Sequence, residues 1–155
     1  MLRSTSIKKD SWKPVKLLAR QPIDGTVIGL SGNREGDIVS VLSDTSISIF
    51  NNRELVEKIV LDGGKEIHLV DFTNSLFIRT TDSLICYDFW GKLNWKYENL
   101  SNNSKICISK NGNSIILANQ DKVYYLNQFG EVEREISLSS PIFEMSLSDK
   151  KQLII

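Results

Sequence analysis

The sequence of 155 residues carries 19 lysines and arginines against 19 aspartates and glutamates, so its formal net charge is zero. A neutral chain has no overall attraction to nucleic acid or to anionic membranes. At 41% hydrophobic residues the chain can fill a core, yet no run approaches the roughly 20 apolar residues of a membrane-spanning helix. The N-terminal residues lack the apolar stretch of a secretory signal, and two cysteines are too few for a disulfide framework. We therefore expect one cytoplasmic domain, residues 1–155, without membrane contact.

The first segment, residues 1–22, is expected to supply half of a repeat unit. Residues 7–8 and 15–20 have the patterns of a third strand and of an outer strand. The segment is also basic, because six lysines and arginines stand against Asp10 in its first 20 residues. This charge fits a contact with an acidic partner or nucleic acid, or a solvated edge strand on which lysines prevent mispairing. We favour the edge strand and do not expect nucleic-acid binding; the candidate partner contacts are Lys8, Lys9, Trp12 and Lys13.

Three complete units follow, residues 23–62, 63–100 and 101–139. Each has four short apolar or alternating stretches separated by turns rich in Asn, Asp and Gly, which predicts four antiparallel strands. Residues 52–59 also have the pattern of a capped helical turn, but the repeat register favours a strand there. The predicted strands are 27–30, 38–42, 46–50 and 55–61; 67–70, 76–80, 84–87 and 92–98; and 105–109, 114–118, 123–126 and 131–138.

The last segment, residues 140–155, is predicted to be the other half unit, with an inner strand at 143–147 and a second strand at 152–155. One position in the inner strands returns every 39 residues, at Ile28, Ile67, Ile106 and Met145. A period near 40 built from strands is typical of β-propeller blades. The predicted fold class is therefore all-β: a propeller of four-stranded antiparallel blades, about four 39-residue repeats permuted by half a blade.

The two half units are complementary, and unpaired strand edges promote aggregation, so we expect the halves to be completed. The chain could close as a four-bladed ring, two copies could exchange halves in an eight-bladed homodimer, or the chain could belong to a longer one. Residues 153–155 stop inside an apolar strand. We therefore place a partial propeller first and the exchanged dimer second.

One unit carries a more specific pattern, in which Asp88 ends the third strand, Gly91 follows, and Trp95 comes four residues later. This pattern resembles the quinoprotein-type (PQQ-like) propeller repeat. The next unit keeps Asn127 and Gly130 but lacks the tryptophan. The broader pattern is similar to WD40-like repeats, although no Trp-Asp pair ends a third strand. The resemblance implies a propeller, a fold that hosts many functions. Quinone-dependent dehydrogenases of this family bind quinone and calcium, but no carboxylates have calcium-ligand spacing here, so we expect no cofactor.

The position that follows Ile28, Ile67, Ile106 and Met145 in the predicted inner strands is the candidate lining of a central channel. A ligand-binding channel and simple filling of a crowded axis are both open, and we favour the filling. The sole histidine excludes a His-pair metal site, no nucleophile motif is present, and the two cysteines fit buried thiols better than a redox pair. The candidate channel residues are Gly29, His68, Cys107 and Ser146.

These features predict a non-catalytic scaffold that mediates protein–protein interaction, with no catalytic residue and no metal ligand. The alternative is a ligand-binding or quinoprotein-type enzyme fragment that uses the channel mouth. Trp90, Trp95 and Phe129 are expected to pack between blades, and any of them that is exposed would be a candidate hot spot for a protein partner.

Overall fold

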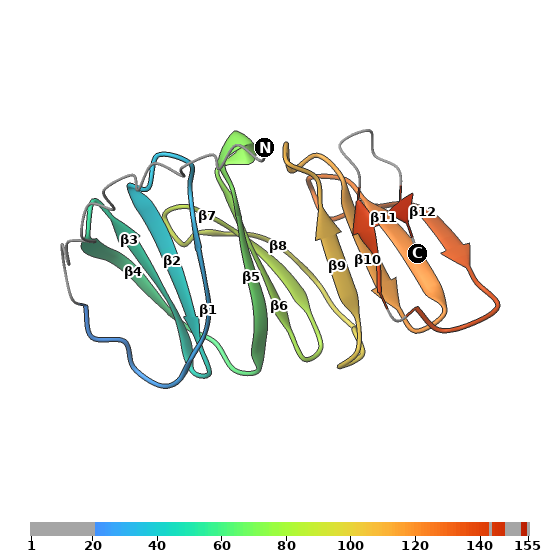
Figure 1. Ribbon diagram of the computed structural model, residues 1–155, viewed down its shortest axis with the longest axis horizontal. Helices are drawn as coiled ribbons and strands as arrows, with labels where there is room; N and C mark the ends of the chain where they lie inside the picture. The colour runs from blue at the N-terminus through green and yellow to red at the C-terminus, as the bar shows by residue number, and fades with distance from the viewer. Residues whose placement is uncertain (1–20, 143, 148–152, 155) are drawn as a thin grey trace, which may run out of the picture.

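The structure is a computed structural model that describes residues 21–142, 144–147 and 153–154. The described chain is all-β, as predicted, and its one helical element is the single 3₁₀ turn η1, Asp71–Thr73. Three four-stranded antiparallel sheets stand side by side in a row that is not closed into a ring (Figure 1). Lys8, Lys9, Trp12 and Lys13 lie outside the described residues.

Within each sheet the strands follow one another in chain order, so neighbouring strands are joined by short hairpins. The predicted order of four strands in each complete unit is confirmed. A two-stranded antiparallel sheet follows, made of β13 (Ser146–Leu147) and β14 (Leu153–Ile154). The three full sheets consist of β1 (Val27–Gly32), β2 (Ile38–Ser43), β3 (Ser46–Asn51) and β4 (Glu54–Val60); β5 (Gly64–Val70), β6 (Ser75–Thr80), β7 (Leu84–Asp88) and β8 (Leu93–Tyr97); and β9 (Lys105–Ile108), β10 (Ile115–Asn119), β11 (Lys122–Leu126) and β12 (Val132–Ser137).

The hairpins explain why the helical alternative at residues 52–59 is wrong. Asn52 and Arg53 have positive φ angles of 49° and 75°, and they form the two-residue turn that joins β3 to β4. A two-residue turn with two positive φ angles matches the twist of the flanking strands. The corresponding turns of the other two sheets are longer, residues 89–92 and 127–131, and each contains a glycine with positive φ.

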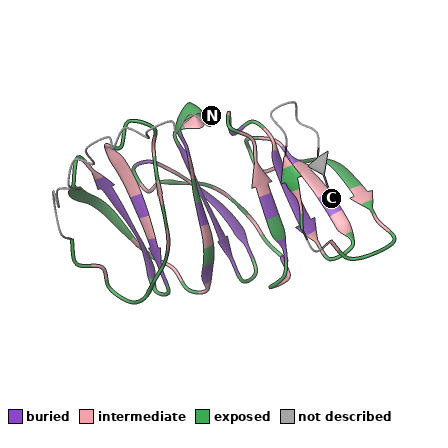
Figure 2. Ribbon diagram, in the orientation of Figure 1, coloured by how far each residue is buried: buried purple, intermediate pink, exposed green. Residues whose placement is uncertain are grey.

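The core lies between the sheets, in two layers. Strand β6 separates them, because all six of its residues are buried and its side chains alternate between two faces. Leu76 and Ile78 pack toward the first sheet, with Leu42, Ile47 and Ile49, whereas Phe77 packs toward the third sheet, with Ile115 and Leu117. Figure 2 shows the buried residues concentrated in the middle strands, with exposure rising toward the outer strands β4, β8 and β12. Burial of Phe77 alone contributes about 1.5–3 kcal/mol relative to exposure.

Candidate functional site

The candidate channel residues occupy the first strand of each sheet, as the repeat predicts. Gly29 lies on β1, His68 on β5, Cys107 on β9 and Ser146 on β13, and β1 is packed beside β5 as β9 is beside β13. His68 and Ser146 are exposed, whereas Gly29 and Cys107 are half-buried. A Cβ on Gly29 would lie 3.3 Å from Cγ2 of Ile67, so this position is filled by the neighbouring strand. The thiol of Cys107 donates to the carbonyl of Met145 at 3.4 Å.

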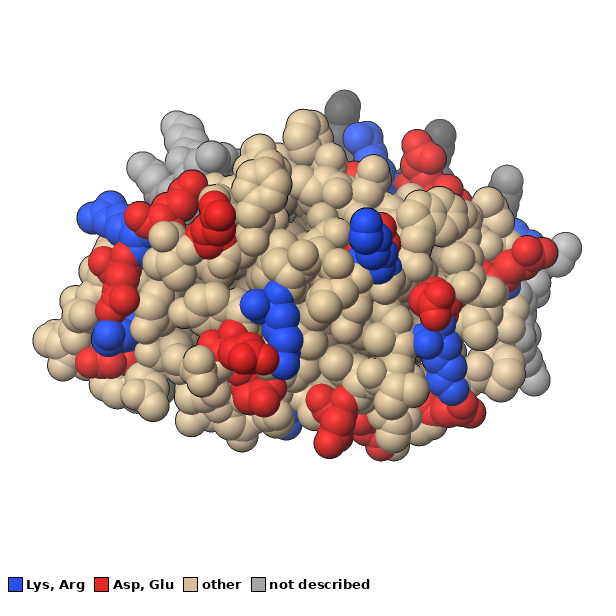
Figure 3. All heavy atoms as spheres, turned by 180° about the vertical axis from the view of Figure 1, so that it is seen from behind, with Lys and Arg blue, Asp and Glu red and all other residues tan. Residues whose placement is uncertain are grey.

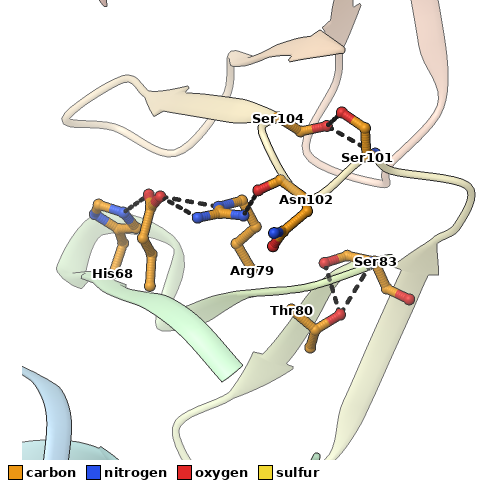
Figure 4. A network of polar contacts seen from close by, with 8 residues as sticks. His68, Arg79, Thr80, Ser83, Ser101, Asn102 and Ser104 are labelled. Carbon is orange, nitrogen blue, oxygen red and sulfur yellow. Dashed lines mark hydrogen bonds and ion pairs between the residues drawn. The ribbon is translucent and has the colours of Figure 1, made fainter. Parts of the chain in front are cut away.

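A charged network that the sequence did not predict lies beside His68 (Figure 4). Arg79 is only 7% exposed, and its Nε and Nη2 atoms lie 2.9 and 2.7 Å from Oε1 of Glu66. Nε2 of His68 lies 3.5 Å from the other carboxylate oxygen. The contact with His68 and the ion pair with Arg79 lower the pKa of Glu66, and partial burial opposes them.

The role of this network is structural, because it connects the second sheet to the segment that leads to the third. The guanidinium of Arg79 also donates through Nη1 to the carbonyl of Asn102, at 3.5 Å, in the segment that leads from β8 to β9. Its charge is therefore neutralised by Glu66 and its donors point at protein acceptors. The visible sign in the sequence was an arginine at the end of the apolar stretch Leu76–Ile78, and Glu66 stands directly opposite it in the β5–β6 register.

The two cysteines are free thiols. Cys86 is 1% exposed, which confirms that it is buried, and Cys107 is half-buried. Burial raises the pKa of both thiols, and because the thiolate is the nucleophile this makes them less reactive at neutral pH.

A second region of interest is one edge of the row of sheets, which we call the loop edge. It carries the hairpins that join the first strand of each sheet to the second and the third strand to the fourth. Strands alternate in direction, so these hairpins all lie at one edge of the row. Consecutive hairpins touch, because the backbone N–H of Arg34 donates to Oδ2 of Asp71 at 2.7 Å. The next loop is equally close, since a Cβ on Gly112 would lie 2.5 Å from Oγ1 of Thr73.

Two turns of the loop edge repeat almost atom for atom. Oδ1 of Asp88 accepts the backbone N–H groups of the residues two and four positions on, and Oδ1 of Asn127 does the same in the third sheet. A glycine three positions on, Gly91 or Gly130, has a positive φ of 83° or 78°. A side chain that accepts two backbone donors replaces part of a strand ladder and fixes the turn.

The turns present aromatic residues to solvent. The prediction that Trp90 and Phe129 pack between blades is wrong, because their side chains project from the turn tips and are 61% and 65% exposed. Phe72, in η1 at the same edge, is 76% exposed. Trp95 does pack inward, because its ring lies 5.9 Å from the ring of Phe77 and its Nε1 donates to the carbonyl of Gln128 at 2.8 Å.

Hollows separate these turns from the neighbouring loops. Between the first and second sheets lie two adjoining hollows of about 370 Å³ each, which share Ile38, Asn74 and Phe89. We call them together the acidic groove, because they are lined by four carboxylates and a single cationic side chain, Arg34, with Trp90 at one wall. Its carboxylates belong to Glu35, Asp37, Asp71 and Asp88.

The corresponding hollow between the second and third sheets is different in charge. It measures about 450 Å³, includes Trp95 and Phe129, and has no charged residue in its lining. At the opposite edge a hollow of about 810 Å³ is lined by residues 139–142 and by polar residues that include Lys105 and Asp121. On the face seen from behind, acidic and basic side chains are interspersed (Figure 3). The lining of the acidic groove, in contrast, is mostly acidic.

Among the described residues, no three or more His, Cys, Asp or Glu side chains are arranged to hold a metal ion. Nor does any helix in that part of the chain have the length and apolarity needed to cross a membrane. Comparison with known proteins adds no identity: no protein-family model matches the chain, and no curated protein is significantly similar to it.

Proposed function

We propose that the chain is a β-propeller module of the type that its sequence resembles. The support is the row of four-stranded sheets with their first strands on one side, and the way consecutive sheets interlock (Figure 1). Trp95 of the second sheet lies under Gly130 of the third and donates to the carbonyl of Gln128. Asp88, Gly91 and Trp95, on which the resemblance to quinoprotein-type repeats rests, thus have structural roles in the turn and in the joint between sheets.

We further propose that the half unit β13–β14 is completed by the N-terminal half unit of a second copy. The β13–β14 pair lies at the far end of the row from the first sheet (Figure 1). The chain enters that first sheet at Gln21, whose side chain donates to the carbonyl of Arg53. Gln21, the first described residue, therefore lies at the end of the row remote from β14. Analytical ultracentrifugation decides the matter: we expect twice the 17.6 kDa of one chain, and a 17.6 kDa species would refute the exchange.

The function that we propose is a non-catalytic scaffold that binds a protein partner through the loop edge. The observation that carries it is the exposure of Phe72, Trp90 and Phe129 at this one edge. Exposed aromatic side chains dominate the binding energy of many protein interfaces. Trp90 and Phe129 stand on turns held by side-chain hydrogen bonds, so little conformational freedom is lost when they dock.

The alternative is a ligand-binding or quinoprotein-type enzyme fragment that uses the channel mouth. The observation in its favour is the group of Glu66, His68 and Arg79 near the first strands. We favour the scaffold because Arg79 is neutralised by Glu66 and donates to a protein carbonyl, which leaves it a structural role. Specific turnover of a small substrate by the purified protein would overturn this preference.

Photo-crosslinking tests the scaffold function. A benzophenone amino acid is placed at Trp90 or Phe129 on the loop edge, and at Asp121 on the opposite edge as the control, and the protein is irradiated in its native cells. We expect the loop-edge positions to capture one protein that the control does not, and the purified partner to bind the wild type more tightly than a Trp90→Ala, Phe129→Ala double variant. Capture of the same proteins at both edges would contradict the proposal.

A further inference from the structure

We propose that the acidic groove binds a lysine- or arginine-bearing extended segment of a protein partner, with its cationic side chain against Trp90. This inference rests on the proposed scaffold function and names the chemistry of the partner at one place on the loop edge. It is carried by three features of the groove: its charge, its apolar floor and its exposed indole.

The charge of the groove favours a cation. Four carboxylates and one guanidinium line it, a net charge of −3 in a chain whose overall charge is zero. A concave surface of one sign attracts a partner of the opposite sign and raises its rate of association. The free energy of placing a basic side chain here is therefore more favourable than anywhere in the neutral hollow at Phe129.

Three of the four carboxylates, those of Asp37, Asp71 and Asp88, are held by hydrogen bonds before any partner arrives. Oδ2 of Asp71 accepts the N–H of Arg34, and Oδ1 of Asp88 accepts those of Trp90 and Lys92. Asp37 accepts from the side chain of Asn33 through Oδ1. Each of these bonds uses one carboxylate oxygen, and a carboxylate has about four acceptor sites in all. These three acids are thus pre-positioned and still have capacity for a charged donor.

The floor and wall suit the long apolar stem of a basic residue. Ile38 is half-buried and Phe89 is 7% exposed, and both line the two hollows. Lysine and arginine bury their methylene stems on apolar surface while the charged head stays among polar groups. Trp90 is 61% exposed and lines the hollow that contains Phe89, and indole is the aromatic ring that binds cations best.

The chain supplies its own matched control. Phe129 stands on the equivalent turn of the third sheet, with similar exposure and the same pattern of hydrogen bonds, but beside a hollow without charge. Truncation of Phe129 removes an aromatic ring from the loop edge and leaves the acidic groove intact. A general loss of apolar surface therefore affects both variants, whereas, of the two aromatic residues, only Trp90 contributes to recognition of a cation.

The experiment measures binding of a fluorescein-labelled peptide of about eight residues that alternates arginine and serine, with a glutamate–serine peptide as its counterpart. We expect saturable binding of the basic peptide only, weakened about 5- to 10-fold by Trp90→Ala and less than about 2-fold by Phe129→Ala. Glu35→Gln should weaken it about 2- to 5-fold, and a rise from about 50 to about 300 mM NaCl should do the same.

Folding is checked by amide NMR spectra, and in the wild type the peptide should shift the amides of Gly36, Asn74 and Trp90. The inference is overturned if the acidic peptide binds equally well, if the basic peptide does not saturate at millimolar concentration, or if the two aromatic variants lose equal affinity. The scaffold function stands in that case, provided that crosslinking at the loop edge still captures a specific partner. If crosslinking fails while the basic peptide binds, the groove recognises cations but the scaffold function is wrong.

Discussion

The joint between the second and third sheets can be tested by adding one methyl group at Gly130. This glycine has a φ of 78°, and a Cβ there would lie 2.6 Å from Cδ2 of Trp95. The ring of Trp95 cannot move away freely, because its Nε1 donates to the carbonyl of Gln128 and the ring packs in a tilted arrangement against that of Phe77. The substitution Gly130→Ala therefore strains the backbone and also overfills the joint.

The two costs can be separated by a control in the same protein. Gly36 has the same φ of 78°, but a Cβ there would meet no atom within 4 Å. Positive φ costs an alanine about 1–2 kcal/mol, of which about 0.4–1 kcal/mol is returned because the unfolded chain becomes less flexible. We expect Gly36→Ala to lower the free energy of unfolding by about 1 kcal/mol. Overpacking adds about 1–3 kcal/mol, so the total for Gly130→Ala is about 2–4 kcal/mol.

Urea unfolding followed by circular dichroism measures both variants, with the urea dependence of the free energy checked for constancy. If Gly130→Ala costs no more than Gly36→Ala, Trp95 does not hold the third sheet as described, and the interlocking of the sheets would have to be explained without it. A Trp95→Ala, Gly130→Ala double variant completes the cycle. Removal of the ring should reduce the cost of the alanine to that seen at Gly36.

Two further predictions concern titratable groups. Because contact with His68 and the ion pair with Arg79 lower the pKa of Glu66 on folding, these contacts add stability above the usual pKa of 4.5, and this stability is lost as the pH falls through the lowered value. Between about pH 5 and about pH 3 the free energy of unfolding, measured with urea, should fall more for the wild type than for Glu66→Gln. An equal fall in both proteins would refute this. Cys107 should be alkylated about 10-fold faster than the fully buried Cys86 in the native protein, as peptide mass spectrometry can show; equal rates would contradict the burial.

The strands were predictable because their signals are local. Alternation of apolar residues identifies a strand, and turn residues such as Asn127 and Gly130 limit it. The 39-residue step then resolved the one ambiguous segment, residues 52–59, in favour of β4. Local signals of this kind need no knowledge of how the sheets are placed relative to one another.

The charged network could have been found with one further step. Glu66 and Arg79 are 13 residues apart and directly opposite in the β5–β6 hairpin. Once the loop at residues 71–74 is assigned, the hairpin register pairs these two residues, and opposite charges in such a cross-strand pair attract. The contact with the carbonyl of Asn102 could not have been found in this way, because it depends on the path of the chain between β8 and β9.

The exposed aromatics were missed for a different reason. Hydrophobicity predicts that Trp90 should be buried, but the turn chemistry of Asp88 directs a residue two positions on to the tip of the hairpin. Trp95, five residues later, is on a strand and does pack inward. An aromatic residue directly before the positive-φ glycine of such a turn should therefore be assigned to the surface of this fold, whereas Phe89, one position earlier in the turn, is buried.

The repeat predicts the scaffold, and the differences between repeats determine what the scaffold can bind. The turn at Asp88 and the turn at Asn127 are equivalent in hydrogen bonding, in glycine position and in the exposure of their aromatic residues. The hollows beside them are not equivalent, because only the first is bordered by the acidic loop that carries Glu35 and Asp37. The turn at Asn127 forms without such a loop beside it, so the charges of Glu35 and Asp37 are not needed to build a turn of this kind. That reasoning makes the acidic groove, more than the shared architecture, the place to look for a partner.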